Sequence, residues 1–341
     1  MIDVGKADLL RYRGVVDRVD IEAVQVGQSE ALLNGVHTLG IVPLSREHFP
    51  MTPVALGLLL VAACLHAGWN FRLKRCQERL VVLWWALAWS AVAVLPVLFF
   101  VPLPVGQAWT FVWASALAQA AYLGLLSLAY SLADFSLVYP VARGSAPLFL
   151  LLWSTQLLHE PLHPRGLVGV GVLSLGLMGM GLSGVLGSGT GLPLGRRMDT
   201  QISALLAALG VAFTISIYTA IDGYAVKNTP ALSYFVAQWC LSVVLALPPL
   251  LFRHRWRSLV EVLRRERGSV AWVGLASALA YLLALQAYTL APVGYAGAVR
   301  EVSVVLGALF GWRFGGEPGG PTRLFSAVVI FTGILLVATA R

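Results

Sequence analysis

The sequence predicts an all-α integral membrane protein in which ten transmembrane helices form two inverted five-helix repeats. Three observations predict this class: an apolar composition, ten apolar runs of membrane-spanning length, and a charged motif that occurs twice. Of the 341 residues, 58% are hydrophobic and 12% are charged, and the mean hydropathy is +0.79. A soluble domain has about 25% charged residues. The composition therefore indicates a chain that lies mostly in lipid.

The chain after residue 50 divides into apolar runs of the length that crosses a bilayer. About 20 apolar residues in a helix cross roughly 30 Å of hydrocarbon. Polar residues, prolines and glycines separate the runs. The ten predicted spans are 53–71, 80–101, 108–131, 135–158, 166–186, 201–221, 231–252, 270–290, 293–314 and 322–340.

The first fifty residues differ in kind from the rest of the chain. They contain seven acidic and five basic residues and no apolar run of spanning length. They also lack the basic start, apolar core and small-residue cleavage site of a signal peptide. Because Met51 directly precedes the first span, we expect residues 1–50 to be either a disordered tail or an upstream extension with a mis-assigned start.

A charged motif occurs once in each half of the apolar region. Arg143 is followed 17 residues later by Glu160, and Arg300 is followed 17 residues later by Glu317. Each glutamate precedes a proline, and a second proline stands three residues further on. The pentapeptide ASALA also occurs twice, as residues 114–118 and 276–280. Such agreement predicts a duplication.

The duplication predicts a division into two five-helix repeats, at 51–186 and 201–341, joined by a linker at 187–200. An odd number of helices per repeat places the second repeat upside down relative to the first. Inverted repeats of this kind bind their substrates between the halves, near the midplane of the membrane.

Arg143 lies in a run without other charges, about 12 Å into the fourth span at 1.5 Å per residue. A guanidinium at the bilayer centre costs from about 3 to more than 10 kcal/mol. Arg143 therefore either reaches back to the interface, pairs with Asp134 or a carbonyl group, or faces a water-filled cavity. The matching position of Arg300 favours the cavity. We also expect Pro140 and Gly144 to loosen the helix beside Arg143.

Other polar residues are candidates for the same cavity. His66 and Asn70 in the first span, and Tyr218 and Asp222 in the sixth, are each spaced i, i+4 and so share a helix face. A buried histidine with satisfied hydrogen bonds, and an aspartate at a helix end, are the alternatives. Glu301 points about 100° away from Arg300 around the helix and is expected to neutralise a neighbour.

Several patterns predict structure rather than chemistry. Glu160 and Glu317 fall at span ends, which favours a helix-terminal role. The glycines of the fifth span indicate close helix packing, either within the chain or in a homodimer. The three cysteines have no metal-ligand spacing, and no catalytic set or nucleotide-binding loop is visible, so we expect no metal and no cofactor. The chain has a net charge of +8, and its basic residues lie in short loops between the apolar spans. Orientation in the bilayer explains such basic loops better than binding of nucleic acid does.

Three segments resemble the EamA-type members of the drug/metabolite transporter superfamily. They are HAGWNFRLK in the first span, YPVARGSAP, which begins at Tyr139, in the fourth, and GYAGAVREVSVVLGALFGWRFGGEP in the ninth. The resemblance covers about residues 53–340. It implies a carrier that exports or exchanges a small metabolite, with a central cavity lined mainly by the first, third and fourth helices of each half.

We therefore expect a secondary transporter in the lipid bilayer of the bacterial cytoplasmic membrane. The alternative is a membrane-embedded enzyme or sensor, for which the sequence contains no catalytic motif or output domain. Two arginines favour an anionic or amino-acid-like substrate. Asp222 first and Glu301 second are the candidates for proton coupling, because burial disfavours the charged form of a carboxylate. The expected substrate-binding residues are Arg143, Arg300, His66, Asn70, Tyr139, Tyr218 and Asp222.

The loop charges predict an orientation. Most lysines and arginines of the loops follow the odd-numbered spans, above all the segment RLKRCQER after the first span. Basic loops stay in the cytoplasm. Both termini are then expected outside, which is opposite to the orientation that the resemblance implies.

Overall fold

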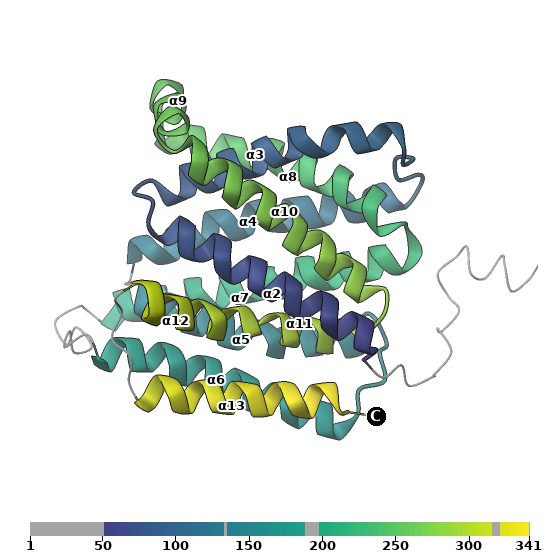
Figure 1. Cartoon of the computed structure of the whole chain (residues 1–341), viewed down its shortest axis with the longest axis vertical. Coiled ribbons are helices and arrows are strands. Elements are labelled where there is room, and N and C mark those ends of the chain that lie inside the picture. The colour runs from purple at the N-terminus through teal and green to yellow at the C-terminus, as the bar shows by residue number, and fades with distance from the viewer. Residues whose placement is uncertain (1–50, 133–134, 188–197, 316–320, 341) are drawn as a thin grey trace, which may run out of the picture. The chain divides into compact units, whose positions relative to one another are not determined.

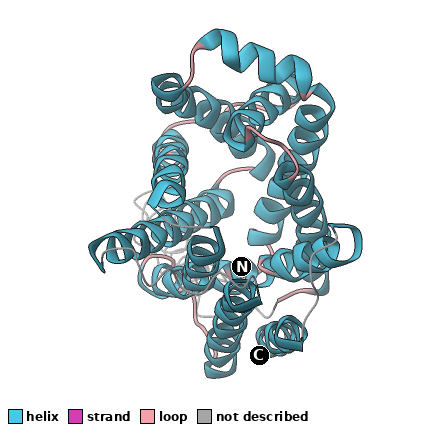
Figure 2. Ribbon diagram, turned by 90° about the vertical axis from the view of Figure 1, so that its left-hand side faces the viewer, coloured by secondary structure: helices cyan, strands magenta, loops and turns pink. Residues whose placement is uncertain are grey.

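Helices account for nearly all of the residues that the structure describes. A computed structural model of the chain describes residues 51–132, 135–187, 198–315 and 321–340 (Figure 1). The predicted extension 1–50 and most of the predicted linker lie outside the described residues. Within the described ranges the chain forms helices joined by loops and contains no strand (Figure 2).

The helices follow one another with short connections. Their bounds are α2 Pro53–Lys74, α3 Arg79–Val94 with the 3-10 helix η1 Leu95–Phe99, α4 Ala108–Leu132, α5 Phe135–Gln156, α6 Pro164–Gly187, α7 Met198–Asn228, α8 Ala231–Arg253, α9 Trp256–Arg265, α10 Arg267–Tyr288, α11 Val293–Arg300, α12 Val302–Gly315 and α13 Pro321–Ala338.

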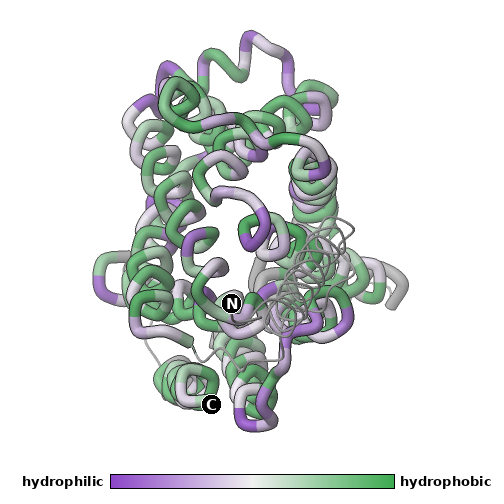
Figure 3. Tube along the Cα trace, turned by 90° about the vertical axis from the view of Figure 1, so that its right-hand side faces the viewer, coloured by the Kyte–Doolittle hydropathy of each residue, from purple (hydrophilic) through white to green (hydrophobic). Residues whose placement is uncertain are grey.

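Seven helical segments of the described chain are long and apolar enough to cross a membrane. They are Pro53–Lys74, Arg79–Phe99, Ala108–Leu126, Ile202–Asn228, Ala231–Arg253, Arg267–Tyr288 and Val293–Phe314. Hydrophobic residues dominate these long helices, and hydrophilic residues gather in short stretches (Figure 3). The predicted all-α membrane protein is confirmed at this level.

Local signals explain where the first of these helices begins and ends. The Oγ1 atom of Thr52 accepts a hydrogen bond from the backbone N–H of Ala55 at 3.1 Å, which caps the start of α2. Pro53 occupies the first turn, where its missing N–H costs nothing. Arg72 and Lys74 occupy the last turn and favour the negative end of the helix dipole.

The predicted ninth span is broken in the middle. Helix α11 ends at Arg300 and α12 begins at Val302, and the backbone N–H of Glu301 bonds to the carbonyl of Ala298 in a tighter turn. Helix α5, in contrast, runs without interruption past Pro140 and Gly144. The helix discontinuity therefore lies in the second half, at Glu301, and not beside Arg143 as the sequence suggested.

The described helices pack in an order that Figure 1 makes visible. Helices α3 and α8 pack together at one end, and α6 and α13 pack together at the other. Between them, α4 packs on α7 and α8, while α10 packs on α2 and α3. Helix α5 contacts α7 and α6, and α11 contacts α5, α2 and α13.

Glycines let α6 and α13 approach until their backbones touch. A Cβ atom on Gly333 would lie 2.6 Å from the backbone nitrogen of Leu173, and one on Gly169 would lie 2.9 Å from the carbonyl oxygen of Gly333. No side chain fits at such distances. At these positions the glycines of the predicted fifth span serve packing within the chain.

Helix α9 is a short surface helix in the segment between the predicted spans 231–252 and 270–290. It lies between α8 and α10, at the upper left of Figure 1. Leu259 and Val262 are its buried residues. Its three arginines are exposed, so α9 is amphipathic and lies with its apolar face against the bundle.

Candidate functional site

Arg143 meets two residues from other helices. Its Nη1 donates to Oε1 of Glu301 at 3.0 Å, and its Nη2 lies 2.8 Å from Nε2 of His66. A guanidinium has no acceptor, so the histidine nitrogen must accept this hydrogen bond. The contact therefore requires the neutral imidazole with its proton on Nδ1. Three elements meet here: α2, α5 and the break between α11 and α12.

The pair formed by Arg143 and Glu301 is withdrawn from solvent. The side chain of Arg143 is 14% exposed and that of Glu301 is 2% exposed. Oε2 of Glu301 is buried and has no hydrogen-bond partner. Glu301 was expected to neutralise a neighbour, and its partner is Arg143, which lies 158 residues away in the sequence. Asp134, the other partner considered for Arg143, lies outside the described residues.

Arg300 makes a different contact. Its Nη1 donates to the hydroxyl oxygen of Tyr288 at 3.0 Å, while its Nε is buried without a hydrogen-bond partner. It also interacts electrostatically with Tyr218, Glu301 and Arg143. The two arginines therefore belong to one cluster, although they bind different partners.

Asp222 is the centre of a second group of polar side chains. It is fully buried on α7 and accepts hydrogen bonds from the hydroxyl of Tyr234 at 2.6 Å and from the hydroxyl of Tyr281. Nε2 of Gln119 on α4 donates to the hydroxyl oxygen of Tyr281 at 3.1 Å. Asp222 also interacts electrostatically with Arg300, which connects this group to the arginine cluster.

The remaining predicted residues occupy varied positions. Asn70 donates its Nδ2 to the carbonyl oxygen of His66 at 2.7 Å and so bonds to its own helix. Tyr218 packs edge-on against Tyr122, with ring centroids 6.2 Å apart. The side chain of Tyr139 lies outside what the structure describes.

Sequence reasoning missed the tyrosines and the glutamine around Asp222. A signal for two of them was present, because Gln119 and Tyr281 each directly follow an ASALA pentapeptide. The structure brings these repeat-related positions into contact. The residue after each copy of the pentapeptide thus marked a contact between α4 and α10. Tyr234 and Tyr288 carried no such signal.

Glu160 joins three elements at one end of the helices. Its Oε1 accepts from Lys227 Nζ at 2.6 Å and from the backbone N–H of Val293 at 2.7 Å. Its Oε2 accepts from the backbone N–H of Gly294 at 3.2 Å and from the hydroxyl of Ser154. A carboxylate on the first N–H groups of α11 confirms the predicted helix-terminal role. Glu317 lies outside the described residues.

The thiol of Cys76, which lies outside the spans, belongs to a group of polar contacts between the end of α2 and the start of α10. Sγ of Cys76 lies 3.7 Å from Oε2 of Glu266, which also accepts from Ser269 at 2.7 Å. Nε of Arg72 donates to Ser269 at 3.1 Å. Burial raises the pKa of the Cys76 thiol, which disfavours the thiolate form that a nucleophile needs.

The fold and the site together define a class of protein. Two of the helical segments long enough to cross a membrane carry Asp222, Arg300 and Glu301, and Arg143 on α5 pairs with Glu301. Intramembrane charges of this kind are typical of polytopic proteins that handle a polar ligand or ion inside the bilayer.

The comparisons with known proteins give the family. Residues 202–339 match the model of the EamA-like transporter family. This match confirms the resemblance to the EamA-type members of the drug/metabolite transporter superfamily that was seen in the sequence. Its members are membrane transporters.

A solved structure shares the fold. A crystal structure, described only as that of a protein, aligns with a TM-score of 0.66 at 18% identity over 83% of this chain and 96% of its own. This identity supports the fold alone. A search of curated proteins finds no match.

Proposed function

We propose that this chain is a secondary carrier that moves a small anionic or amino-acid-like metabolite across the bacterial cytoplasmic membrane by alternating access. The observation that carries the proposal is the buried cluster of Arg143, Glu301, His66 and Arg300, which draws its members from both halves of the chain. Ionised groups inside the bilayer are costly, so they are rare and mark substrate or ion pathways.

The packing supports two five-helix halves of inverted topology. When the halves are exchanged, α4 packing on α7 and α8 becomes α10 packing on α2 and α3, and both sets of contacts exist. Helix α3 corresponds to α8 and α6 corresponds to α13, and each of these helices packs on its own counterpart. Ten transmembrane helices follow if α5, α6 and α13 also cross the membrane. The break at Glu301 resembles the discontinuous helices that line carrier sites.

The charges favour an anionic group on the substrate. Arg143 and Arg300 carry two positive charges, and Glu301 carries one negative charge, so this cluster keeps one net positive charge. The buried Nε of Arg300 offers a hydrogen-bond donor, and the buried Oε2 of Glu301 offers an acceptor. A carboxylate would bind the first, and an ammonium group would bind the second.

Protonation of Asp222 would couple proton binding to substrate binding. When Asp222 is ionised, its charge offsets the remaining positive charge near Arg300; when it is protonated, the positive charge is available to the substrate. Proton binding and anion binding then assist each other through one coupling free energy. This arrangement makes Asp222 the first candidate for proton coupling and Glu301 the second.

Counterflow into proteoliposomes tests the proposal. Vesicles with purified protein are loaded with one unlabelled compound from a panel of amino acids, organic acids and nucleobases, and uptake of the labelled compound is measured with and without a proton gradient. We expect saturable exchange of at least one carboxylate-bearing compound. Absence of exchange for every anion, together with exchange of a cation, would contradict the proposal.

A further inference from the structure

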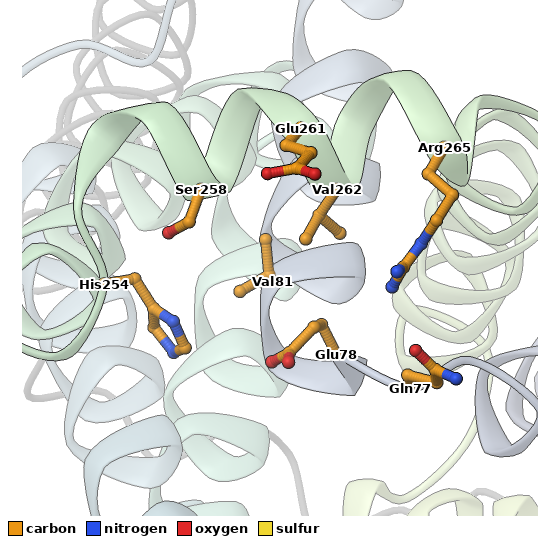
Figure 4. Close-up of a pocket in the computed structure, with 8 residues that line it drawn as sticks. All are labelled: Gln77, Glu78, Val81, His254, Ser258, Glu261, Val262 and Arg265. Atoms are coloured by element: carbon orange, nitrogen blue, oxygen red, sulfur yellow. The ribbon is translucent and has the colours of Figure 1, made fainter.

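We propose that a cavity beside α9 binds the headgroup of a phospholipid that carries both a phosphate and a primary ammonium group, as phosphatidylethanolamine does. The cavity has a volume of about 220 Å³ and lies between α9, the start of α3 and the residue that follows α8 (Figure 4). Neither the transport proposal nor the cluster around Arg143 contributes to it.

The cavity lies at the depth where headgroups are found. Glu78 immediately precedes the membrane-spanning segment Arg79–Phe99, and His254 immediately follows the segment Ala231–Arg253. Both segments therefore end at the cavity. The ends of spanning helices lie at the boundary between the hydrocarbon and the polar headgroups.

Helix α9 forms a fixed wall of this cavity. Nε1 of Trp85 on α3 donates to the carbonyl oxygen of Leu259 at 2.8 Å. The rings of Trp85 and Trp256 lie 5.9 Å apart, and Leu259 is fully buried. Trp256 itself is 51% exposed and Phe252 is 90% exposed. Exposed aromatic rings beside an amphipathic helix are typical of the membrane interface.

The lining combines both charges that such a headgroup requires. Figure 4 shows Glu261 and Glu78 reaching into the cavity from opposite walls, with His254 and Arg265 at its two ends. Two carboxylates that face one small space favour a cation between them. The guanidinium of Arg265 is suited to bind phosphate oxygens, and the imidazole of His254 can donate to them.

The ammonium group decides which headgroup fits best. An ethanolamine ammonium has three N–H donors and can bond to both carboxylates. A choline group has the same charge but no N–H donor. A glycerol headgroup has no positive charge and would leave the two carboxylates facing each other. The cavity chemistry therefore favours ethanolamine over choline and glycerol.

Competition between two lipids of equal charge tests this proposal. The full chain is purified and mixed with equal amounts of phosphatidylethanolamine and phosphatidylcholine that have identical acyl chains, and native mass spectrometry measures which lipid is retained. We expect retention of the ethanolamine lipid to exceed that of the choline lipid about tenfold, because hydrogen bonds to charged groups are lost with choline.

Variants locate the effect in this cavity. Glu78→Gln with Glu261→Gln should bring the two lipids to nearly equal retention, and Arg265→Gln should lower the retention of both. Arg257→Gln, on the same helix but outside the lining, should leave the preference unchanged. Thermal unfolding of each variant in detergent checks that it is folded, and Glu261→Gln alone replaces the double variant if that one unfolds.

Three results would overturn the proposal. The first is equal retention of both lipids by the unaltered protein. The second is an unchanged preference in the folded glutamate variants. The third is displacement of the lipid by free O-phosphoethanolamine at comparable concentrations, which would mean that the cavity serves a soluble ligand and not a lipid.

Discussion

The side chains of Arg143 and Glu301 form a buried ion pair across 158 residues of sequence. If Arg143 only faced a water-filled cavity, water could fill the space when this side chain is removed. With Glu301 only 2% exposed, the loss of Arg143 instead leaves a buried carboxylate without its partner. Breaking a buried pair from one side costs about 3–5 kcal/mol.

This pair gives a prediction in which stability and binding separate. We expect Arg143→Ala to lower the free energy of unfolding by about 3 kcal/mol and to abolish substrate binding. Arg143→Gln combined with Glu301→Gln should recover most of the stability, since no charge remains unpaired, but should not recover binding. Thermal unfolding in detergent and substrate binding to the same samples measure both effects. Unchanged substrate affinity in the double variant would remove the arginine from the site.

Asp222 gives a second prediction, which concerns coupling. Asp222→Asn keeps the size of the side chain and an acceptor for one tyrosine hydroxyl, but it cannot ionise. We expect exchange to continue and accumulation driven by a proton gradient to stop, because exchange moves no net proton. Tyr234→Phe is the control, since it removes one hydrogen bond and keeps the carboxylate. Full proton-driven accumulation by Asp222→Asn would transfer the coupling role to Glu301.

Helix α11 connects two polar sites although it has only eight residues. Its first N–H groups bond to Glu160, and its last residue is Arg300, beside the break at Glu301. Lys227, at the end of α7, completes the carboxylate site. Glu160 thus holds the start of the short helix whose last residue is Arg300.

The donors around Glu160 predict an asymmetry between its two charged partners. Glu160→Ala leaves Lys227 and the buried backbone N–H of Val293 without their acceptor, while the N–H of Gly294 keeps the hydroxyl oxygen of Ser154. We therefore expect a loss of about 3 kcal/mol in stability. Lys227→Ala leaves Glu160 with three other donors, and we expect a loss of about 1 kcal/mol. Thermal unfolding of both variants in detergent provides the comparison. A larger loss for Lys227→Ala would show that the ion pair, and not the helix cap, stabilises this region.

The described part of the molecule gathers its basic loops at one end. Arg72, at the end of α2, bonds to Ser269 near the start of α10, so the basic segment after α2 lies beside the basic segment around α9. Positively charged loops remain in the cytoplasm during insertion. This contact supports the predicted orientation, because both basic segments then face the same side.

The orientation gives a prediction for the whole protein. If this end faces the cytoplasm, the segment after α2 lies inside. Nine more of the ten predicted spans follow it, and an odd number of crossings places the carboxy terminus outside. We expect a carboxy-terminal alkaline phosphatase fusion to be active in bacteria and a fluorescent protein fusion at the same position to be dark. A fluorescent fusion with an inactive phosphatase would reverse the orientation. Fusions to the segment after α2 are the internal control and should give the opposite result.

The sequence by itself determined the helical membrane class, the approximate span limits and the repeated arginine and glutamate frame. Hydropathy and spacing are local properties, and a helix in lipid must satisfy its backbone hydrogen bonds within itself. Glu160 was placed at a helix end for the same reason. The break at Glu301 escaped detection because no proline or glycine stands directly beside it.

Only the tertiary structure decided which residues meet. Arg143 binds Glu301 and His66, and Asp222 binds Tyr234 and Tyr281, through contacts between different helices. A helix that is apolar on most of its surface gives little periodic signal for the face that turns inward, since lipid and protein neighbours are equally apolar. The choice of partners therefore depends on how the helices pack, and the sequence of a single helix does not contain it.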